Sequence, residues 1–137
     1  MSLRNLEFFF KSQSVAVIGA SDRAQSVGAT VMANLGSGAY RGRIMPVNPA
    51  HRRIHGMLAA RSVADLDFTP ELAVVCSPPA SVPGIISDLG ARGCKAAVVL
   101  TGGLSSQSLP DGRTLTQAML DAARPHLLRI LGPNCLG

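Results

Sequence analysis

Five short, largely apolar runs constrain the fold of this chain more than any other feature. Each run closes on glycine or proline, and together they cover residues 15–19, 43–49, 72–79, 95–103 and 127–132. Continuous apolar runs indicate strands buried on both faces, because a strand with one solvated face alternates apolar and polar residues. The runs therefore predict a parallel sheet with a covering layer on each side.

Helical periodicity separates these strands. After Ser26, a residue type that caps helix N-termini, apolar residues recur every four positions over 27–35. A second apolar face falls within 82–89, with Gly93 placed to end the helix, and a third falls within 115–122. Alternating strands and helices predict an α/β fold, a Rossmann-like three-layer sandwich with a mainly parallel sheet of about five or six strands.

Length and composition agree with a packed globular chain. The 137 residues, of which 47% are hydrophobic and 15% charged, fit one domain over 1–137. The apolar runs fall short of the roughly 18 residues of a membrane span, and no secretory signal is visible. Three cysteines without a C-x-x-C spacing predict reduced thiols in a cytoplasmic protein and no metal site.

The net charge of +5 is unevenly distributed. No acidic residue stands between Asp22 and Asp65, whereas six arginines and two histidines do. Tyr40 is the single aromatic residue in that span, so the stacking surfaces of nucleic-acid-binding proteins are missing. Two interpretations stay open: a solvated basic face, or a site for a small anionic ligand.

The strand ends are predicted to meet. Right-handed crossovers bring the carboxyl ends of parallel strands to one edge, where open α/β sheets bind ligands. The five ends are Gly19-Ala20-Ser21, Val47-Asn48-Pro49, Ser77-Pro78-Pro79, Thr101-Gly102-Gly103 and Gly132-Pro133-Asn134. In a single turn, these residue types can be explained by the backbone geometry of the turn alone. All five at one edge favour a ligand cleft, since small residues let backbone N–H groups approach an anion.

The loop after the first strand departs from the dinucleotide fingerprint. With Gly19 as its first glycine, G-x-G-x-x-G requires glycines where Ser21 and Ala24 stand. Asn48 occupies the place of the acid that binds an NAD ribose. NAD is therefore disfavoured, and NADP stays open because an arginine at 52–53 could meet a 2′-phosphate.

The basic residues divide between the two edges of the predicted sheet. Arg23 in the first loop and His51 after the second strand belong at the ligand edge, with 52–53 beside His51. Arg41 and Arg43 precede the second strand and belong at the opposite edge. Several cations at one edge suit a ligand with several phosphates.

No set of catalytic residues can be assembled at the predicted ligand edge. His51 and His55 have no acid near them in sequence, and the position of His126 before the last strand is typical of a surface or packing residue. The hydroxyl groups at the strand ends have no base to activate them. We expect a binding platform without catalytic residues, and whether the parent protein is an enzyme stays open.

The motifs VAVIGASDR, GRIMPVNP, LAVVCSPP, KAAVVLTGG and LGPNCLG together resemble the CoA-binding domain of the NDP-forming acyl-CoA synthetases, a superfamily that includes the succinyl-CoA synthetase α-subunit. The opening NLEFFFKSQSVAVIGASDR is especially similar to bacterial proteins that join an acyl-CoA-synthetase-like region to a GNAT domain and acetylate protein lysines. The resemblance runs from about Asn5 to Gly137 and implies a domain that binds CoA or acyl-CoA.

The resemblance also implies which residues bind. The loop around the phosphates and the following helix start would comprise Gly19, Ala20, Ser21, Arg23, Ser26, Val27 and Gly28. The adenosine would be flanked by Val47, Asn48, Pro49 and His51, the adenine or pantetheine by Ser77, Pro78 and Pro79, the pantetheine by Thr101 and Gly102, and the closing turn would include Asn134. Relatives often carry lysine in place of His51, so a permanent charge becomes a titratable one here.

In the resembling family the catalytic phosphohistidine, the ATP-grasp region and any GNAT domain follow this domain. We therefore expect residues 1–137 to be a fragment of a multidomain acyl-CoA synthetase or acetyltransferase that binds without turnover, with homo-oligomerisation left open. Two alternatives remain: an NAD(P)-binding module of a dehydrogenase or redox sensor, and a structural Rossmann-like domain with a vestigial cleft.

Overall fold

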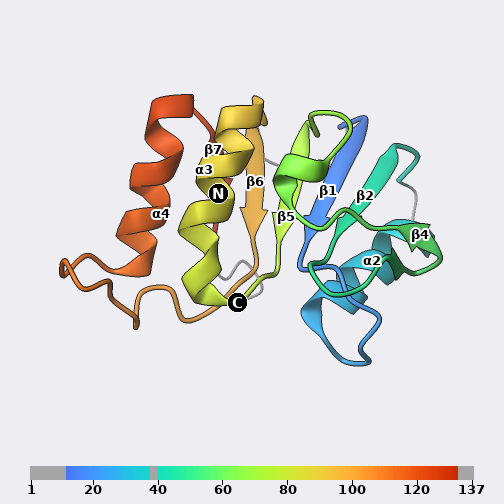
Figure 1. Ribbon diagram of the computed structural model, residues 1–137, viewed down its shortest axis with the longest axis horizontal. Helices are drawn as coiled ribbons and strands as arrows, with labels where there is room; N and C mark the ends of the chain where they lie inside the picture. Colours follow the sequence, from blue (N-terminus) through green and yellow to red (C-terminus); the bar gives the residue numbers. More distant parts are fainter. Residues whose placement is uncertain (1–11, 38–39, 133–137) are drawn as a thin grey trace.

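The computed structural model describes residues 12–37 and 40–132, and a five-stranded parallel sheet forms their centre (Figure 1). Its strands are β1 (Ser14–Ile18), β2 (Arg43–Val47), β5 (Leu72–Val75), β6 (Ala96–Val99) and β7 (Arg129–Leu131). They lie in the order β2-β1-β5-β6-β7, and each neighbouring pair is parallel. The predicted α/β fold is confirmed. This is a common doubly wound order, whose switch point lies between β1 and β5.

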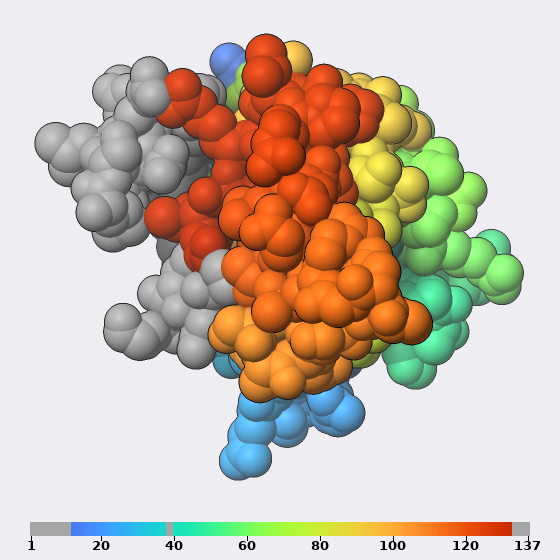
Figure 2. All heavy atoms as spheres, turned by 90° about the vertical axis from the view of Figure 1, so that its left-hand side faces the viewer, coloured from blue at the N-terminus to red at the C-terminus, as the bar shows by residue number. Residues whose placement is uncertain are grey.

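Helices cover both faces of the sheet. They are α2 (Val27–Ser37) on one face, and α3 (Val82–Arg92) and α4 (Leu115–Ala123) side by side on the other (Figure 1). Val15 and Val17 belong to one buried cluster with Met32 of α2, whereas Ala16 and Ile18 belong to a second cluster with residues of α3 and α4. In the side view, α4 and the segment leading into it form the outer surface (Figure 2). Both faces of the central strands are therefore buried, as their apolar sequences predicted.

The predicted capping residues stand at the ends of α2 and α3, Ser26 before the first and Gly93 after the second. The Ser26 hydroxyl accepts the N–H of Ala29 at 3.1 Å, at the start of α2. Gly93 ends α3 in the left-handed conformation, with a φ of 97°. Both capping residues help to satisfy backbone groups that a helix end leaves without an intrahelical partner.

The last strand is shorter than the predicted strand over 127–132. Leu127 follows the 3-10 helix η3 (Arg124–His126) with a φ of 54°, which a strand does not permit, so β7 begins at Arg129. His126 is a packing residue, because a Cβ on Gly90 of α3 would collide with its ring.

A small hairpin, which the sequence did not predict, lies between β2 and β5. Its strands are β3 (Arg53–Ile54) and β4 (Met57–Leu58), and they pair antiparallel. The turn residues His55 and Gly56 have φ angles of 50° and 76°, as in a type I′ turn. Ile54 is fully buried in the cluster on the α2 side of the sheet. Two-residue strands carry too little periodicity to be read from a sequence.

Two glycines let the loop after β1 pack tightly. Gly19 has a φ of 89°, and a Cβ on it would lie 2.8 Å from the Cys76 carbonyl carbon. A Cβ on Gly28 would collide with the Gly19 carbonyl oxygen. Helix α2 therefore packs closely against the end of β1 at Gly28.

Within residues 12–37 and 40–132, no helix is long and apolar enough to cross a membrane. The same residues contain no cluster of three His, Cys, Asp or Glu side chains that could hold a metal ion. Cys76 and Cys94 are free thiols, and Cys135 lies outside the described residues.

Candidate functional site

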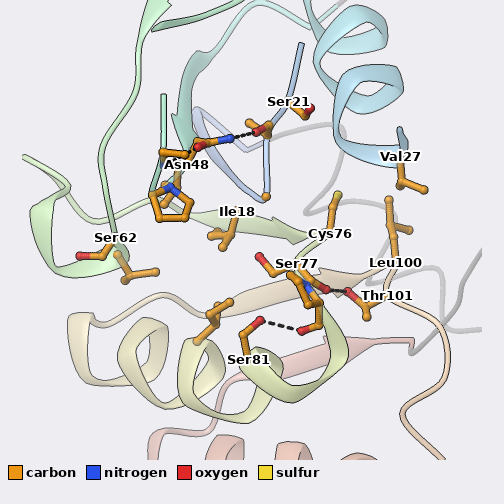
Figure 3. A pocket seen from close by; sticks show the side chains of 18 of the residues that line it. Ile18, Ser21, Val27, Asn48, Ser62, Cys76, Ser77, Ser81, Leu100 and Thr101 are labelled. Atoms are coloured by element: carbon orange, nitrogen blue, oxygen red, sulfur yellow. Dashed lines mark hydrogen bonds between the residues drawn. The ribbon is translucent and has the colours of Figure 1, made fainter. Parts of the chain in front are cut away.

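A cleft of about 960 Å³ opens at the carboxyl edge of the sheet. Its walls come from the loops that follow β1, β2, β5 and β6, together with one side of α3 (Figure 3). The switch point between β1 and β5 lies at its centre, because Ile18 and Cys76 both line it. The cleft is therefore where doubly wound sheets bind ligands, and its volume lies at the upper end of the usual range for ligand pockets.

Most of the predicted site residues meet in this cleft. Those that line it are Gly19, Ala20, Ser21, Arg23, Val27, Val47, Asn48, Pro49, His51, Ser77, Pro78, Pro79, Thr101 and Gly102. Ser26 and Gly28 do not line it. They support the first loop instead, Ser26 as the cap of α2 and Gly28 through its close packing on Gly19. Asn134 lies outside the described residues.

Asn48 connects the first two loops. Its Nδ2 donates to the Ala20 carbonyl at 2.9 Å, and its Oδ1 accepts the N–H groups of Ala50 at 2.7 Å and His51 at 2.9 Å (Figure 3). An aspartate could accept the two N–H groups but could not donate to Ala20. The amide at this position thus has a structural cause, and no carboxylate stands at residue 48, directly after β2, to bind a ribose.

Hydroxyl groups hold the opposite wall. Thr101 Oγ1 donates to the Ser77 carbonyl at 2.7 Å, and Ser81 Oγ donates to the Pro78 carbonyl at 2.6 Å (Figure 3). The first bond links the ends of β5 and β6, and the second closes the turn into the 3-10 helix η2 (Pro79–Ser81). These hydroxyls donate to backbone carbonyls, so the wall is rigid and none of them is prepared for nucleophilic attack.

The cations in the cleft lack protein partners. Arg23, His51 and Arg61 line the cleft, and none of their side chains forms an ion pair or hydrogen bond with another described residue. Two arginines outside the cleft do have carboxylate partners: Arg43 meets Asp67 at 3.3 Å, and Arg113 meets Asp111 at 3.0 Å. Two arginine side chains without a carboxylate partner among the described residues, with the titratable His51 beside them, can neutralise an anionic ligand in this cleft.

The start of α2 adds a second feature that suits anions. Val27, the first residue of α2, lines the cleft. The first N–H groups of a helix have no intrahelical acceptor and lie at the positive end of its dipole. Of the N–H groups in this first turn, the Ser26 hydroxyl accepts that of Ala29. This end of the cleft therefore suits a phosphate.

Ten lining residues were not predicted from the sequence. They are Ile18, Ala50, Arg61, Ser62, Val63, Cys76, Ser81, Ile85, Asp88 and Leu100. Arg61, Ser62 and Val63 follow the unpredicted hairpin. Ile85 and Asp88 lie one helical turn apart on α3, a spacing that could have indicated that they share a face. The apolar members give the cleft surfaces on which the uncharged part of a ligand can pack.

The arginine pair considered for NADP does not reach the cleft. Arg52 and Arg53 are absent from its lining, and Arg53 Nη1 donates to the Gly56 carbonyl inside the hairpin at 3.2 Å. Arg61, which follows the hairpin in the chain, lines the cleft instead. The hairpin explains why Arg61 and not Arg53 lines the cleft, because the chain turns back between residues 53 and 58.

Cys76 is the single cysteine among the described lining residues. Burial raises the pKa of its thiol to about 11. The group is therefore protonated at neutral pH and is a poor nucleophile. Its place in the cleft is that of a small, mostly apolar side chain.

A comparison with known families identifies the domain. The model of the family described as "CoA binding domain" matches residues 13–137. The chain belongs to this family. Membership confirms the resemblance drawn from the five motifs, and with it the function as a CoA-binding domain of the acyl-CoA synthetase type. It does not favour the NAD(P) alternative.

Relatives with curated names support the same assignment. This CoA-binding domain is 36% identical over 132 residues to an ADP-forming acetate–CoA ligase of Methanocaldococcus jannaschii, covering 96% of this chain and 18% of the relative. It is 31% identical to the α-subunit of an ADP-forming acetate–CoA ligase II of Pyrococcus furiosus, covering 96% of this chain and 28% of that subunit. The chain thus spans less than a third of either relative.

A solved structure shares the architecture. An acetyl-coenzyme A synthetase 1 from Candidatus Korarchaeum cryptofilum, determined with phosphate and ADP, superimposes with a TM-score of 0.84 at 32% identity. The match covers 96% of this CoA-binding domain and 28% of that chain. The five-stranded sheet and its helices therefore resemble one domain of that longer synthetase.

Proposed function

We propose that the cleft at the carboxyl edge of the sheet binds CoA or acyl-CoA, and that the chain is the cofactor-binding domain of an ADP-forming acyl-CoA synthetase. The observation that carries this proposal is that Arg23 and Arg61, which have no ion-pair partner among the described residues, line the cleft together with His51, and that the N-terminus of α2 borders it. CoA has several phosphate charges to be neutralised there, together with an adenine and a pantetheine arm that can pack on apolar walls.

Different residues of the cleft would bind different parts of CoA. The Ala20–Ser21 backbone, Arg23 and the first turn of α2 would hold phosphate oxygens through N–H groups and a guanidinium. The Gly19 N–H donates to the Val47 carbonyl at 3.0 Å. Asn48 keeps this loop in place through its bond to Ala20. Ser77 and Thr101, bonded to each other, would form a fixed wall along the pantetheine.

In this proposal the catalytic groups lie in other domains of the parent protein. The hydroxyls of Thr101 and Ser81 donate to backbone carbonyls, and the raised pKa of Cys76 keeps its thiol protonated. The domain would hold CoA so that its thiol or thioester meets reactive groups of other domains, such as phosphohistidine and ATP-grasp units. A GNAT partner, homo-oligomerisation and a cytoplasmic location remain predictions from the sequence.

Calorimetric titration of the 137-residue chain with CoA, 3′-dephospho-CoA, NADH and NADPH tests the proposal. We expect micromolar binding of CoA that weakens as salt rises, because phosphate contacts are screened. Binding of NADPH without binding of CoA would overturn the proposal. Failure of all four ligands to bind would favour the alternative of a structural domain with a vestigial cleft.

A further inference from the structure

One side chain ties the loop after β1 to the hairpin. Asp22 lies between Ser21 and Arg23, both of which line the cleft. Its Oδ1 accepts the backbone N–H of His55 at 2.9 Å and lies 3.5 Å from Nε2 of the same residue. We refer to this pair of contacts as the Asp22–His55 clasp. It joins residues 33 positions apart in sequence.

The hairpin is a firm support for this contact. Ile54, which precedes the turn, has 0% exposure, and Met57, which follows it, packs against the same cluster of buried residues. The hairpin is closed by a further bond, from the N–H of Ala59 to the Arg52 carbonyl at 2.8 Å. The core therefore sets the position of the His55 N–H, and the first loop adapts to it.

The loop has few other attachments. Its first residue is held by the bond from Asn48 to Ala20, and its last turn by the bond from Ser26 Oγ to the Arg23 carbonyl at 2.8 Å. Among the hydrogen bonds and ion pairs of the described residues, the clasp is the one that connects residues 21–25 to another element of the fold. Gln25 in this segment has a φ of 67°, a conformation uncommon for residues other than glycine.

We propose that Asp22 is a positioning residue: through His55 it holds the loop in the conformation that places the Ser21 and Arg23 groups around the phosphates of CoA. The inference rests on the proposed function, because it concerns the same cleft. Without the clasp the loop would sample more conformations, and ligand binding would have to order it. Asp22 does not line the cleft, so it acts through its neighbours.

The charge of Asp22 requires a matched pair of variants. A carboxylate near bound phosphates repels them, so any neutral substitution gains affinity from that source alone. Asp22→Asn and Asp22→Ala remove the same charge, but only asparagine retains an oxygen that can accept the His55 N–H. The difference between the two variants therefore measures the clasp without the electrostatic contribution.

The test compares CoA affinities at a temperature where circular dichroism shows both variants fully folded. We expect Asp22→Asn to bind CoA at least as tightly as the wild-type chain and Asp22→Ala to bind about three- to tenfold more weakly than Asp22→Asn, the range for one hydrogen bond. His55→Asn keeps the backbone donor at a position that asparagine tolerates and leaves the charge of Asp22 in place, so its CoA affinity should stay close to that of the wild-type chain.

The outcomes separate the two proposals. Equal affinities of Asp22→Asn and Asp22→Ala, in a chain whose wild type binds CoA, would overturn the positioning role and leave the CoA site intact. A wild-type chain that does not bind CoA would contradict the proposed function itself. If Asp22→Ala does not fold, hydrogen exchange on the wild type decides: the clasp requires a slowly exchanging His55 amide without CoA, and rapid exchange would refute it.

Discussion

Replacement of Gly28 by alanine should break the packing of α2 against the loop that shapes the cleft. A Cβ at this position would collide with the Gly19 carbonyl oxygen and lie 3.1 Å from the carbonyl carbon of Gly19 and 3.2 Å from the Ser21 nitrogen. All three atoms belong to the backbone, so no side-chain rotation relieves the overlap. Helix and loop must separate, and the cost of such overpacking is about 1–3 kcal/mol.

A second glycine of the same helix provides the control. A Cβ at Gly36 would meet nothing within 4 Å. Alanine is favoured over glycine in helix interiors by up to about 1 kcal/mol, and this gain applies to both positions. Gly36→Ala should therefore stabilise the chain slightly, and the difference between the two variants isolates the overlap at Gly28.

Thermal unfolding and CoA titration measure the effect. With about 3 °C per kcal/mol for a domain of this size, the midpoint of Gly28→Ala should lie about 3–10 °C below that of Gly36→Ala. CoA affinity should fall for Gly28→Ala alone, because the displaced loop carries Ser21 and Arg23. Equal midpoints and equal affinities would refute the close contact between α2 and the end of β1.

Two further predictions concern the walls of the cleft. Arg23→Ala and Arg61→Ala should each weaken CoA binding about three- to tenfold at low salt and less at high salt. Arg41→Ala, before the amino end of β2, should leave CoA affinity unchanged. Equal salt-dependent losses of affinity in all three variants would indicate a diffuse electrostatic field instead of a binding site. Burial raises the pKa of Cys76 to about 11, so its alkylation, followed by peptide mass spectrometry, should accelerate about tenfold per pH unit between pH 7 and 10. A rate that levels off near pH 8 would contradict the protonated thiol.

The sequence alone determined the layers and the edge at which the site lies. Residues 72–75 and 96–99 are apolar at every position because both of their faces are buried, and that pattern needs no tertiary information to be recognised. Glycine, proline and asparagine at the strand ends marked the loops, because these turns require residues of restricted or unusual backbone geometry. Most of the predicted site residues follow from these two facts and from the resemblance to a family.

Tertiary structure decided which cations share the cleft. The sequence placed Arg52 and Arg53 at the ligand edge and gave Arg61 no place there, but the hairpin uses Arg53 internally and Arg61 reaches the cleft. The hairpin has only two residues in each strand, and its position depends on the burial of Ile54. Local periodicity cannot report such an element, because its stability comes from a core formed by distant segments.

Contacts between distant residues were likewise beyond the sequence. His55 had no acid near it along the chain, yet Asp22 accepts its N–H once the β1 loop and the hairpin lie side by side. Asp88 joins the cleft because α3 presents one turn of its surface to the loops. Sequence patterns thus determine which segments become strands, helices and turns, since those depend on local backbone preference and burial. The partners of each charged side chain are set by the packing of segments far apart in the chain, and only the folded structure determines them.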